Sequence, residues 1–187
     1  MPAVAHVEGF AIVSADGMLA GADGVMPASL MFPADQRFFE AGLERADVAV
    51  HGRHSQEDLR GSRERRRLIA THRVGALAPD PANPHALLWN PAGASLDAAV
   101  GALGLTDARV AVIGATHVFG LFLGRYDAFY LTRGPAIRLP GGRPVFPGVP
   151  DLTPEAVLSA HGLACAAKHV LDAAAGLAVA EWRRAAP

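Results

Sequence analysis

Short apolar runs alternate with segments of helical or turn-forming character along most of the chain. Runs rich in valine, isoleucine and leucine predict strands, and apolar residues spaced three to four positions apart predict helices. The predicted strands are 4–13, 48–51, 68–71, 86–89, 110–113 and 128–132. The predicted helices begin at Pro33 and Ser55 and cover 96–103 and 118–123. Because strands alternate with helices, we expect an α/β three-layer sandwich with a central mainly parallel sheet and helices on both faces.

The C-terminal part of the chain has a different pattern. Prolines interrupt residues 135–154, so this stretch is expected to be irregular. Beyond it, the apolar segments 163–171 and 177–182 flank a turn of small residues. They predict an antiparallel hairpin that closes the edge of the sheet, with a helix as the alternative because alanine is frequent here. We expect residues 1–187 to form one domain, since this length can bury a core.

Composition narrows the classes of partner. The formal net charge is -1 and the isoelectric point is near 6.7, so the chain as a whole does not attract nucleic acid or an anionic membrane. No apolar run is long enough to span a bilayer, and the N-terminus lacks the features of a secretion signal. We expect a cytoplasmic protein that binds neither nucleic acid nor membrane. Scattered histidines predict no metal site, and the single Cys165 is expected to be a buried thiol.

Two glycine turns are the most informative local signal. Strands 48–51 and 110–113 end in Gly52 and Gly114, and polar residues follow each glycine. A glycine at this place lets the backbone turn sharply and approach a ligand, and the free N–H groups after it attract an anion. The two turns could hold the two ends of one dinucleotide.

Positive charge gathers around the first of these turns. Arg53 directly follows Gly52, and the next strand ends in Thr71, His72 and Arg73 after an arginine run at 65–67. A dinucleotide with an extra phosphate on its adenosine ribose needs such cations, and the glycine fingerprint and acidic residue of NADH-binding Rossmann domains are absent from the sequence. The pattern favours NADPH. For the run 65–67, a solvated charged surface is the competing interpretation.

Asp35 lies in the first turn of the helix that begins at Pro33, close in sequence to Phe32, Phe38 and Phe39. A carboxylate there can simply offset the helix dipole. Beside aromatic rings, however, an ionised acid requires a partner, and a cationic or amidine-like heterocycle would be one. The same acid could help move a proton during the reduction of a C=N bond.

Taken together, several segments resemble the dihydrofolate reductase fold family, and within it the reductase domain of riboflavin-biosynthesis deaminase-reductases. The segments that carry the resemblance, in family order, are 13–20 (VSADGMLA), 32–39 (FPADQRFF), 45–55 (RADVAVHGRHS), 112–119 (VIGATHVF), 126–132 (YDAFYLT) and 140–147 (PGGRPVFP). The chain departs from the folate enzymes at the second turn, where Gly114 is followed by Ala115 rather than by a second glycine joined through a cis peptide.

The resemblance implies roles for individual residues. Asp35 would be the catalytic acid that grips the heterocycle, with Val13, Phe39 and Thr132 as further substrate-binding residues. Thr132 would form a hydrogen bond with the carboxylate. The resemblance implies that NADPH would be bound by Asp16, Gly17, Gly52, Arg53, His54, Ser55, Thr71, His72, Gly114, Ala115, Thr116, His117, Val118 and Phe119. Of these, Asp16 and Gly17 belong to a loop, 16–26, that would close over the nicotinamide.

These residues lead to one main hypothesis and two alternatives. The main one is an NADPH-dependent reductase that transfers a hydride to a small-molecule heterocyclic substrate, a pterin or a ribosylaminopyrimidine such as 5-amino-6-(5-phosphoribosylamino)uracil. A dihydrofolate reductase is the first alternative. The second is a non-catalytic module that binds a nucleotide or pterin. The resemblance to riboflavin-type reductases also implies a homodimer.

Overall fold

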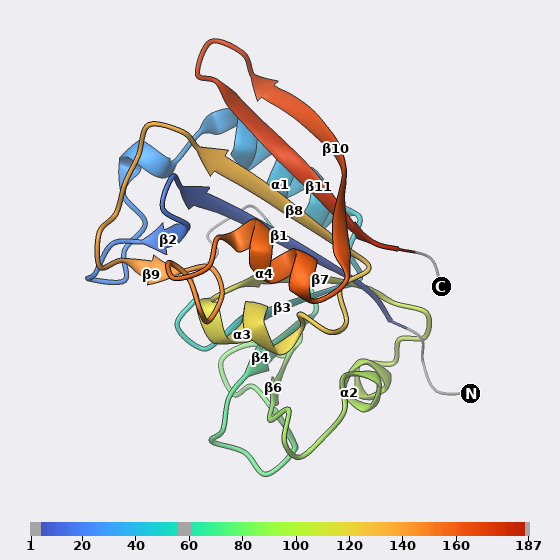
Figure 1. Ribbon diagram of the computed structural model, residues 1–187. Coiled ribbons are helices and arrows are strands. Elements are labelled where there is room, and N and C mark those ends of the chain that lie inside the picture. Colours follow the sequence, from blue (N-terminus) through green and yellow to red (C-terminus); the bar gives the residue numbers. More distant parts are fainter. Residues whose placement is uncertain (1–4, 56–60, 186–187) are drawn as a thin grey trace.

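The computed structural model describes residues 5–55 and 61–185 (Figure 1). The strands are β1 (His6–Ser14), β2 (Met18–Ala20), β3 (Val48–Gly52), β4 (Arg67–Ala70), β5 (Leu77–Pro79), β6 (Ala86–Trp89), β7 (Arg109–Gly114), β8 (Ala128–Gly134), β9 (Arg143–Pro144), β10 (Leu163–Asp172) and β11 (Leu177–Arg184). The helices are α1 (Pro33–Glu44), α2 (Leu96–Ala102), α3 (Thr116–Leu121) and α4 (Pro154–Ala160), with a 3-10 turn η1 (Ala28–Leu30). None of the helices in the described ranges is long and apolar enough to cross a membrane.

A nine-stranded sheet with the order β10-β11-β8-β1-β7-β3-β4-β6-β5 forms the centre of the molecule. The strands from β8 to β6 pair in parallel, whereas β10 and β11 form an antiparallel hairpin that joins β8. Helix α1 covers one face, and α2, α3 and α4 pack on the core of the other face (Figure 1). The expected α/β sandwich is therefore confirmed, and so is the C-terminal hairpin.

Most predicted elements agree with the structure to within two residues at each end, and the elements that sequence reasoning missed lie in segments expected to be irregular. The short strands β2, β5 and β9 and the turn η1 had no clear periodicity. Helix α4 was missed because Pro154 was counted among the prolines of an irregular stretch. It occupies the first helical turn, where proline is favoured, and Thr153 caps the helix by accepting from Ala156 N–H at 3.1 Å. The helix predicted at Ser55 falls on 56–60, outside the described residues, as does the predicted strand residue Val4.

The larger core lies between the sheet and α2–α4 and contains a cluster of aromatic rings. Phe129 contacts Tyr126, Phe119 and Phe146, with ring centroids 5.0, 5.6 and 5.1 Å apart. All four side chains are fully buried. Gly9 of β1 lies against this cluster, and a Cβ there would come within 2.3 Å of the Phe129 ring and 2.9 Å of the Tyr126 ring. The rings thus occupy the space that a side chain would need.

Gly9→Ala is expected to destabilise the fold by about 1–3 kcal/mol, because tightly packed rings must move to admit one methyl group. Gly101→Ala is the matched control, since Gly101 lies in α2 with open space around its Cβ position. It should be neutral or stabilise by up to about 1 kcal/mol through helix propensity. Urea unfolding of both variants measures the difference, and equal stabilities would refute this packing.

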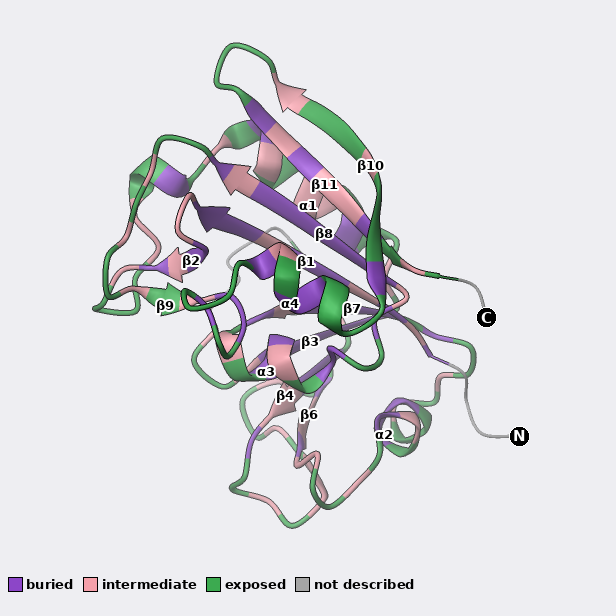
Figure 2. Cartoon of the chain, viewed as in Figure 1, coloured by how far each residue is buried: buried purple, intermediate pink, exposed green. Residues whose placement is uncertain are grey.

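The prediction for Cys165 was wrong. This residue is exposed on β10, the outermost strand, most of whose residues are exposed (Figure 2). The apolar neighbours that suggested burial belong to an edge strand that little else covers. The pairing of β10 with β11 shifts register at two places, and β10 also contains Lys168. Both an irregular ladder and a lysine discourage an edge strand from pairing with a strand of another molecule. The homodimer implied by the resemblance stays a prediction.

Candidate active site

The predicted ligand-binding turns lie at one edge of the sheet, where parallel strands end. In the register of the sheet, Gly52 of β3 is opposite Ala70 of β4, and Ala70 is opposite Trp89 of β6. On the other side of β3, His51 is opposite Gly114 of β7. The segments that follow β3, β4 and β7 therefore emerge side by side. This is the edge at which open α/β sheets usually bind ligands.

The two glycine turns lie next to each other, although they are about sixty residues apart in the sequence. A Cβ on Gly52 would lie 3.9 Å from the backbone nitrogen of Ala115 and 3.6 Å from Cγ2 of Val118. It would also lie 4.0 Å from the hydroxyl of Ser55. A side chain at this position would fill the space between the turns. Because glycine has no side chain, that space between the two turns stays open.

The second turn exposes some of its predicted residues and buries others. Ala115 and His117 are exposed, and Thr116 donates its hydroxyl to the carbonyl of Pro144 at 2.5 Å. The Gly114–Ala115 peptide bond is cis, and Gly114 has φ of +132°. In contrast, the side chains of Val118 and Phe119 are buried in the core, and the Phe119 N–H donates to the Ala115 carbonyl. The side chains of these two residues therefore pack in the core behind the turn and do not face solvent.

The first turn presents polar and cationic side chains to solvent. Arg53 and His54 are exposed and contact each other, with 3.1 Å between Nη2 and Nε2. Ser55 is half-buried beside Gly114. After β4, Thr71 is buried and its hydroxyl accepts from the Arg73 N–H, while His72 is exposed. Arg53, His72 and Arg73 therefore share this edge of the sheet. The arginine run at 65–67 does not, because Arg67 begins β4 opposite Ala49, toward the other edge, so the prediction that this run joins the cluster was wrong.

Asp35 and Thr132 meet on the opposite face from the larger core. Asp35 lies in the first turn of α1, and Thr132 lies on β8 and is 1% exposed. The Thr132 hydroxyl donates a hydrogen bond to the Asp35 carboxylate. Burial raises the pKa of Asp35, and the hydrogen bond from Thr132 only partly offsets this rise. The pair is an acid in a largely apolar setting that a polar ligand could reach.

Aromatic rings line α1 beyond this acid. Phe39, one helical turn after Asp35, is half-buried and contacts Phe10 with ring centroids 6.3 Å apart. Phe10 stacks on Tyr130 at 5.0 Å, and Phe38 packs on the same Tyr130 ring. Val13 is fully buried in the larger core, so its side chain lies away from Asp35.

The loop that follows β1 is held by its own side chains. The Asp16 carboxylate accepts hydrogen bonds from the Ser14 hydroxyl at 2.6 Å and from the Leu139 N–H at 3.0 Å. Burial acts to raise the pKa of Asp16, but these donors and Arg138 outweigh it, so the pKa is lowered. Gly17 has φ of +83°, and a Cβ there would come within 2.8 Å of Val149. Both residues thus fix the loop itself.

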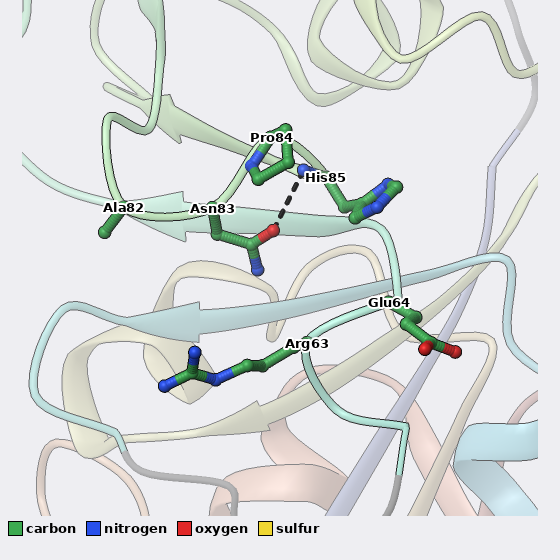
Figure 3. A pocket seen from close by; sticks show the side chains of 6 residues that line it. All are labelled: Arg63, Glu64, Ala82, Asn83, Pro84 and His85. Atoms are coloured by element: carbon green, nitrogen blue, oxygen red, sulfur yellow. Dashed lines mark hydrogen bonds between the residues drawn. The ribbon is translucent and has the colours of Figure 1, made fainter.

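A separate cavity lies elsewhere in the described part of the chain. It is an open cleft of about 440 Å³ lined by Arg63, Glu64 and residues 82–85 (Figure 3). Within it the Asn83 side chain accepts from the His85 N–H at 2.9 Å. The lining segments precede β4 and β6, so the cleft faces the edge of the sheet opposite the glycine turns. In the described ranges, no three His, Cys, Asp or Glu residues are grouped so as to hold a metal ion.

Comparison with known proteins identifies structural neighbours rather than sequence relatives. No family model matches the chain, and no curated protein sequence matches it. A solved structure of a protein named for riboflavin biosynthesis, from Shewanella sp. PV-4, is 22% identical with a TM-score of 0.68, over 97% of this chain and 99% of that one. Dihydrofolate reductase of Enterococcus faecalis, solved with NADP(H) and RAB-propyl, is 16% identical with a TM-score of 0.63, over 97% of both chains.

A third neighbour is larger than this chain. It is the diaminohydroxyphosphoribosylaminopyrimidine deaminase and 5-amino-6-(5-phosphoribosylamino)uracil reductase of Thermotoga maritima, 15% identical with a TM-score of 0.64. The match covers 96% of this chain but only 56% of that protein. Each of the three neighbours matches at least 96% of this chain with a TM-score of 0.63 or more, so the protein has the dihydrofolate reductase-like fold.

Proposed function

We propose that the protein is an NADPH-dependent reductase that transfers a hydride to a pterin or ribosylaminopyrimidine. The observation that carries the proposal is the Asp35–Thr132 pair, an acid with a raised pKa in the same fold that brings the two glycine turns together. Reductases with this fold supply the precedent, and one such structure contains NADP(H). Fold similarity alone does not carry a function to this chain, so the proposal depends on these residues.

The residues of the two glycine turns fit a dinucleotide. Gly52 and Gly114 leave room for backbone contact, and Ser55, Ala115 and Thr116 would surround the pyrophosphate. Arg53 and His54, with Thr71 and His72, would meet the adenosine end, where an exposed guanidinium suits a ribose phosphate. NADPH, when bound, supplies the hydride.

Asp35 is assigned two tasks that follow from its setting. Its carboxylate would accept hydrogen bonds from ring N–H groups and so orient the heterocycle, while Thr132 fixes the carboxylate. The raised pKa keeps a proton on the Asp35 carboxyl oxygen to a higher pH than an exposed aspartate would allow. The same oxygen can therefore deliver the proton that the substrate nitrogen requires after hydride addition to carbon.

The substrate is the finer part of the proposal, and we favour the ribosylaminopyrimidine. One of the three neighbours is named for riboflavin biosynthesis and matches 97% of this chain, and another is named as a 5-amino-6-(5-phosphoribosylamino)uracil reductase. The test is oxidation of NADPH by purified protein with the ribosylaminopyrimidine and, separately, with dihydrofolate. We expect turnover with the first. Turnover with dihydrofolate alone would identify the folate enzyme, and NADPH binding without oxidation by either would favour the non-catalytic module.

Arg53→Ala is expected to weaken NADPH binding by about 1–2 kcal/mol, or roughly tenfold, because a charge-assisted phosphate contact on the surface is lost. Binding of NADH, which lacks this phosphate, should change little. Arg109→Ala is the matched control, since it removes the same charge at the start of β7, on the opposite edge of the sheet. Fluorescence titration with both cofactors measures the effect. Equal losses of NADPH and NADH affinity would contradict the assignment of Arg53 to the ribose phosphate.

A further inference from the structure

Arg133 lies next to Thr132 on β8, and neighbouring residues of a strand point to opposite faces of the sheet. Thr132 faces α1 and contacts Asp35, as described above. Arg133 faces the other side, toward the loop after β1 and the start of α4. In the register it is opposite Val13 of β1 and Ala178 of β11. Two adjacent residues thus reach two different parts of the candidate site.

The Arg133 guanidinium joins three segments. Its Nη1 donates to the carbonyl oxygen of Ala15 at 2.8 Å and lies 3.4 Å from that of Ser14. Its Nη2 donates to the carboxylate of Glu155 in the first turn of α4. The side chain is 31% exposed, so the ion pair with Glu155 adds little stability by itself. Its effect is geometric, because a planar guanidinium fixes several acceptors in one plane.

The other contacts of this loop lead to a different segment. The Ala15 N–H donates to the carbonyl oxygen of Ile137 at 2.6 Å, and the Val145 N–H donates to the carbonyl oxygen of Gly17 at 3.0 Å. The Asp16 carboxylate accepts from the Leu139 N–H. These contacts tie the loop to residues 137–145, a largely irregular connection. Arg133 is a side chain of the sheet that links the loop to both β8 and α4.

We propose that Arg133 is a positioning residue for hydride transfer, which fixes loop residues 14–17 against β8 and α4. This inference rests on the proposed function and on the expectation, implied by the resemblance, that loop 16–26 would close over the nicotinamide. Thr132, the neighbour of Arg133 on β8, orients Asp35. The same end of β8 therefore fixes the positions of both the acid and the loop. A displacement of about 1 Å between reacting groups can cost on the order of 100-fold in rate, so such a shared anchor matters.

The test uses Arg133→Met, which keeps an unbranched stem of similar extent to the aliphatic part of arginine and removes the donors, and Arg133→Lys, which keeps the charge without the planar fork. Glu155→Gln weakens only the contact with α4. Lys168→Gln is the control, because Lys168 is a cation that lines the same cleft as Arg133. Amide hydrogen exchange of residues 14–20 is measured in the free protein, and NADPH affinity is measured by fluorescence. Exchange in α1 reports on general unfolding.

We expect Arg133→Met to speed exchange in residues 14–20 about tenfold or more, with α1 unchanged, and to weaken NADPH binding by a similar factor. Arg133→Lys and Glu155→Gln should be intermediate, and Lys168→Gln should match the wild type. Unchanged exchange in the loop of all three Arg133 and Glu155 variants would overturn the anchor. Faster exchange with unaltered NADPH affinity would overturn its role in positioning. Failure of the wild-type protein to bind NADPH would instead refute the proposed function.

Discussion

Asp35→Asn is expected to lower the rate of NADPH-dependent reduction by about 100-fold or more while NADPH affinity stays the same. The amide keeps the shape of the side chain and can still accept from Thr132, but it cannot hold the transferable proton or balance a cationic heterocycle. Single-turnover oxidation of NADPH measures the chemical step. A variant that reduces substrate at the wild-type rate would remove Asp35 from the mechanism.

The same substitution is expected to raise stability at neutral pH. Because burial raises the pKa of Asp35, the folded protein binds this proton more tightly than the unfolded chain does. Below the unfolded pKa the acid is protonated in both states and contributes no pH dependence. As the pH rises through the folded pKa, the buried group becomes charged and stability is lost. The neutral amide of the variant does not ionise, so the variant has no such loss.

Urea unfolding across a pH series tests whether the wild-type protein loses stability in this way as the pH rises. The variant should match the wild type in acid and exceed it near neutral pH, whereas Asp151→Asn, at an exposed position, should leave the pH dependence unchanged. An Asp35→Asn protein that is less stable than wild type at neutral pH would contradict the account of the buried acid. We therefore expect Asp35→Asn to increase stability at neutral pH and to decrease activity.

Gly52→Ala is expected to weaken NADPH binding by at least about tenfold, or roughly 1.4 kcal/mol. The added methyl group would lie between the two turns, 3.6 Å from Val118 and 3.9 Å from the nitrogen of Ala115, at ordinary contact distances. The fold should therefore survive, while the backbone approach to a phosphate is blocked.

Gly124→Ala is the matched control, because its Cβ position is open and Gly124 precedes β8, at the other edge of the sheet. Titration with NADPH and a thermal melt of each variant separate binding from folding. A Gly52→Ala protein with wild-type affinity would mean that the space between the turns does not hold the phosphates.

Local features of the candidate site could be predicted from the sequence, because they depend on neighbouring residues. Gly52 and Gly114 each follow a short apolar run, and that pattern alone indicates a turn at the end of a strand. The pairing of Asp35 with Thr132 has no local signal, since the two residues lie far apart in the sequence. It came only from the resemblance to a family, and the structure then brought the two together.

Other features depend on the order of the strands, which periodicity does not give. Cys165 was expected to be buried because its neighbours are small and apolar, but β10 is the outermost strand and little covers it. Arg133 drew no attention in the sequence, because its role requires the loop after β1 and helix α4 on the same side of β8. The loop was predicted, but helix α4 was missed for the reason given above, so the contact that joins them through Arg133 could not be anticipated.

A crystal structure with NADPH tests the central claim most directly, because one cofactor is expected to lie across both turns. The predicted result has the pyrophosphate between the Gly52 and Ala115 backbones, the ribose phosphate at Arg53, and the nicotinamide directed toward Asp35. Binding of NADPH at the Arg63–His85 cleft, or with its nicotinamide directed away from Asp35, would contradict the account.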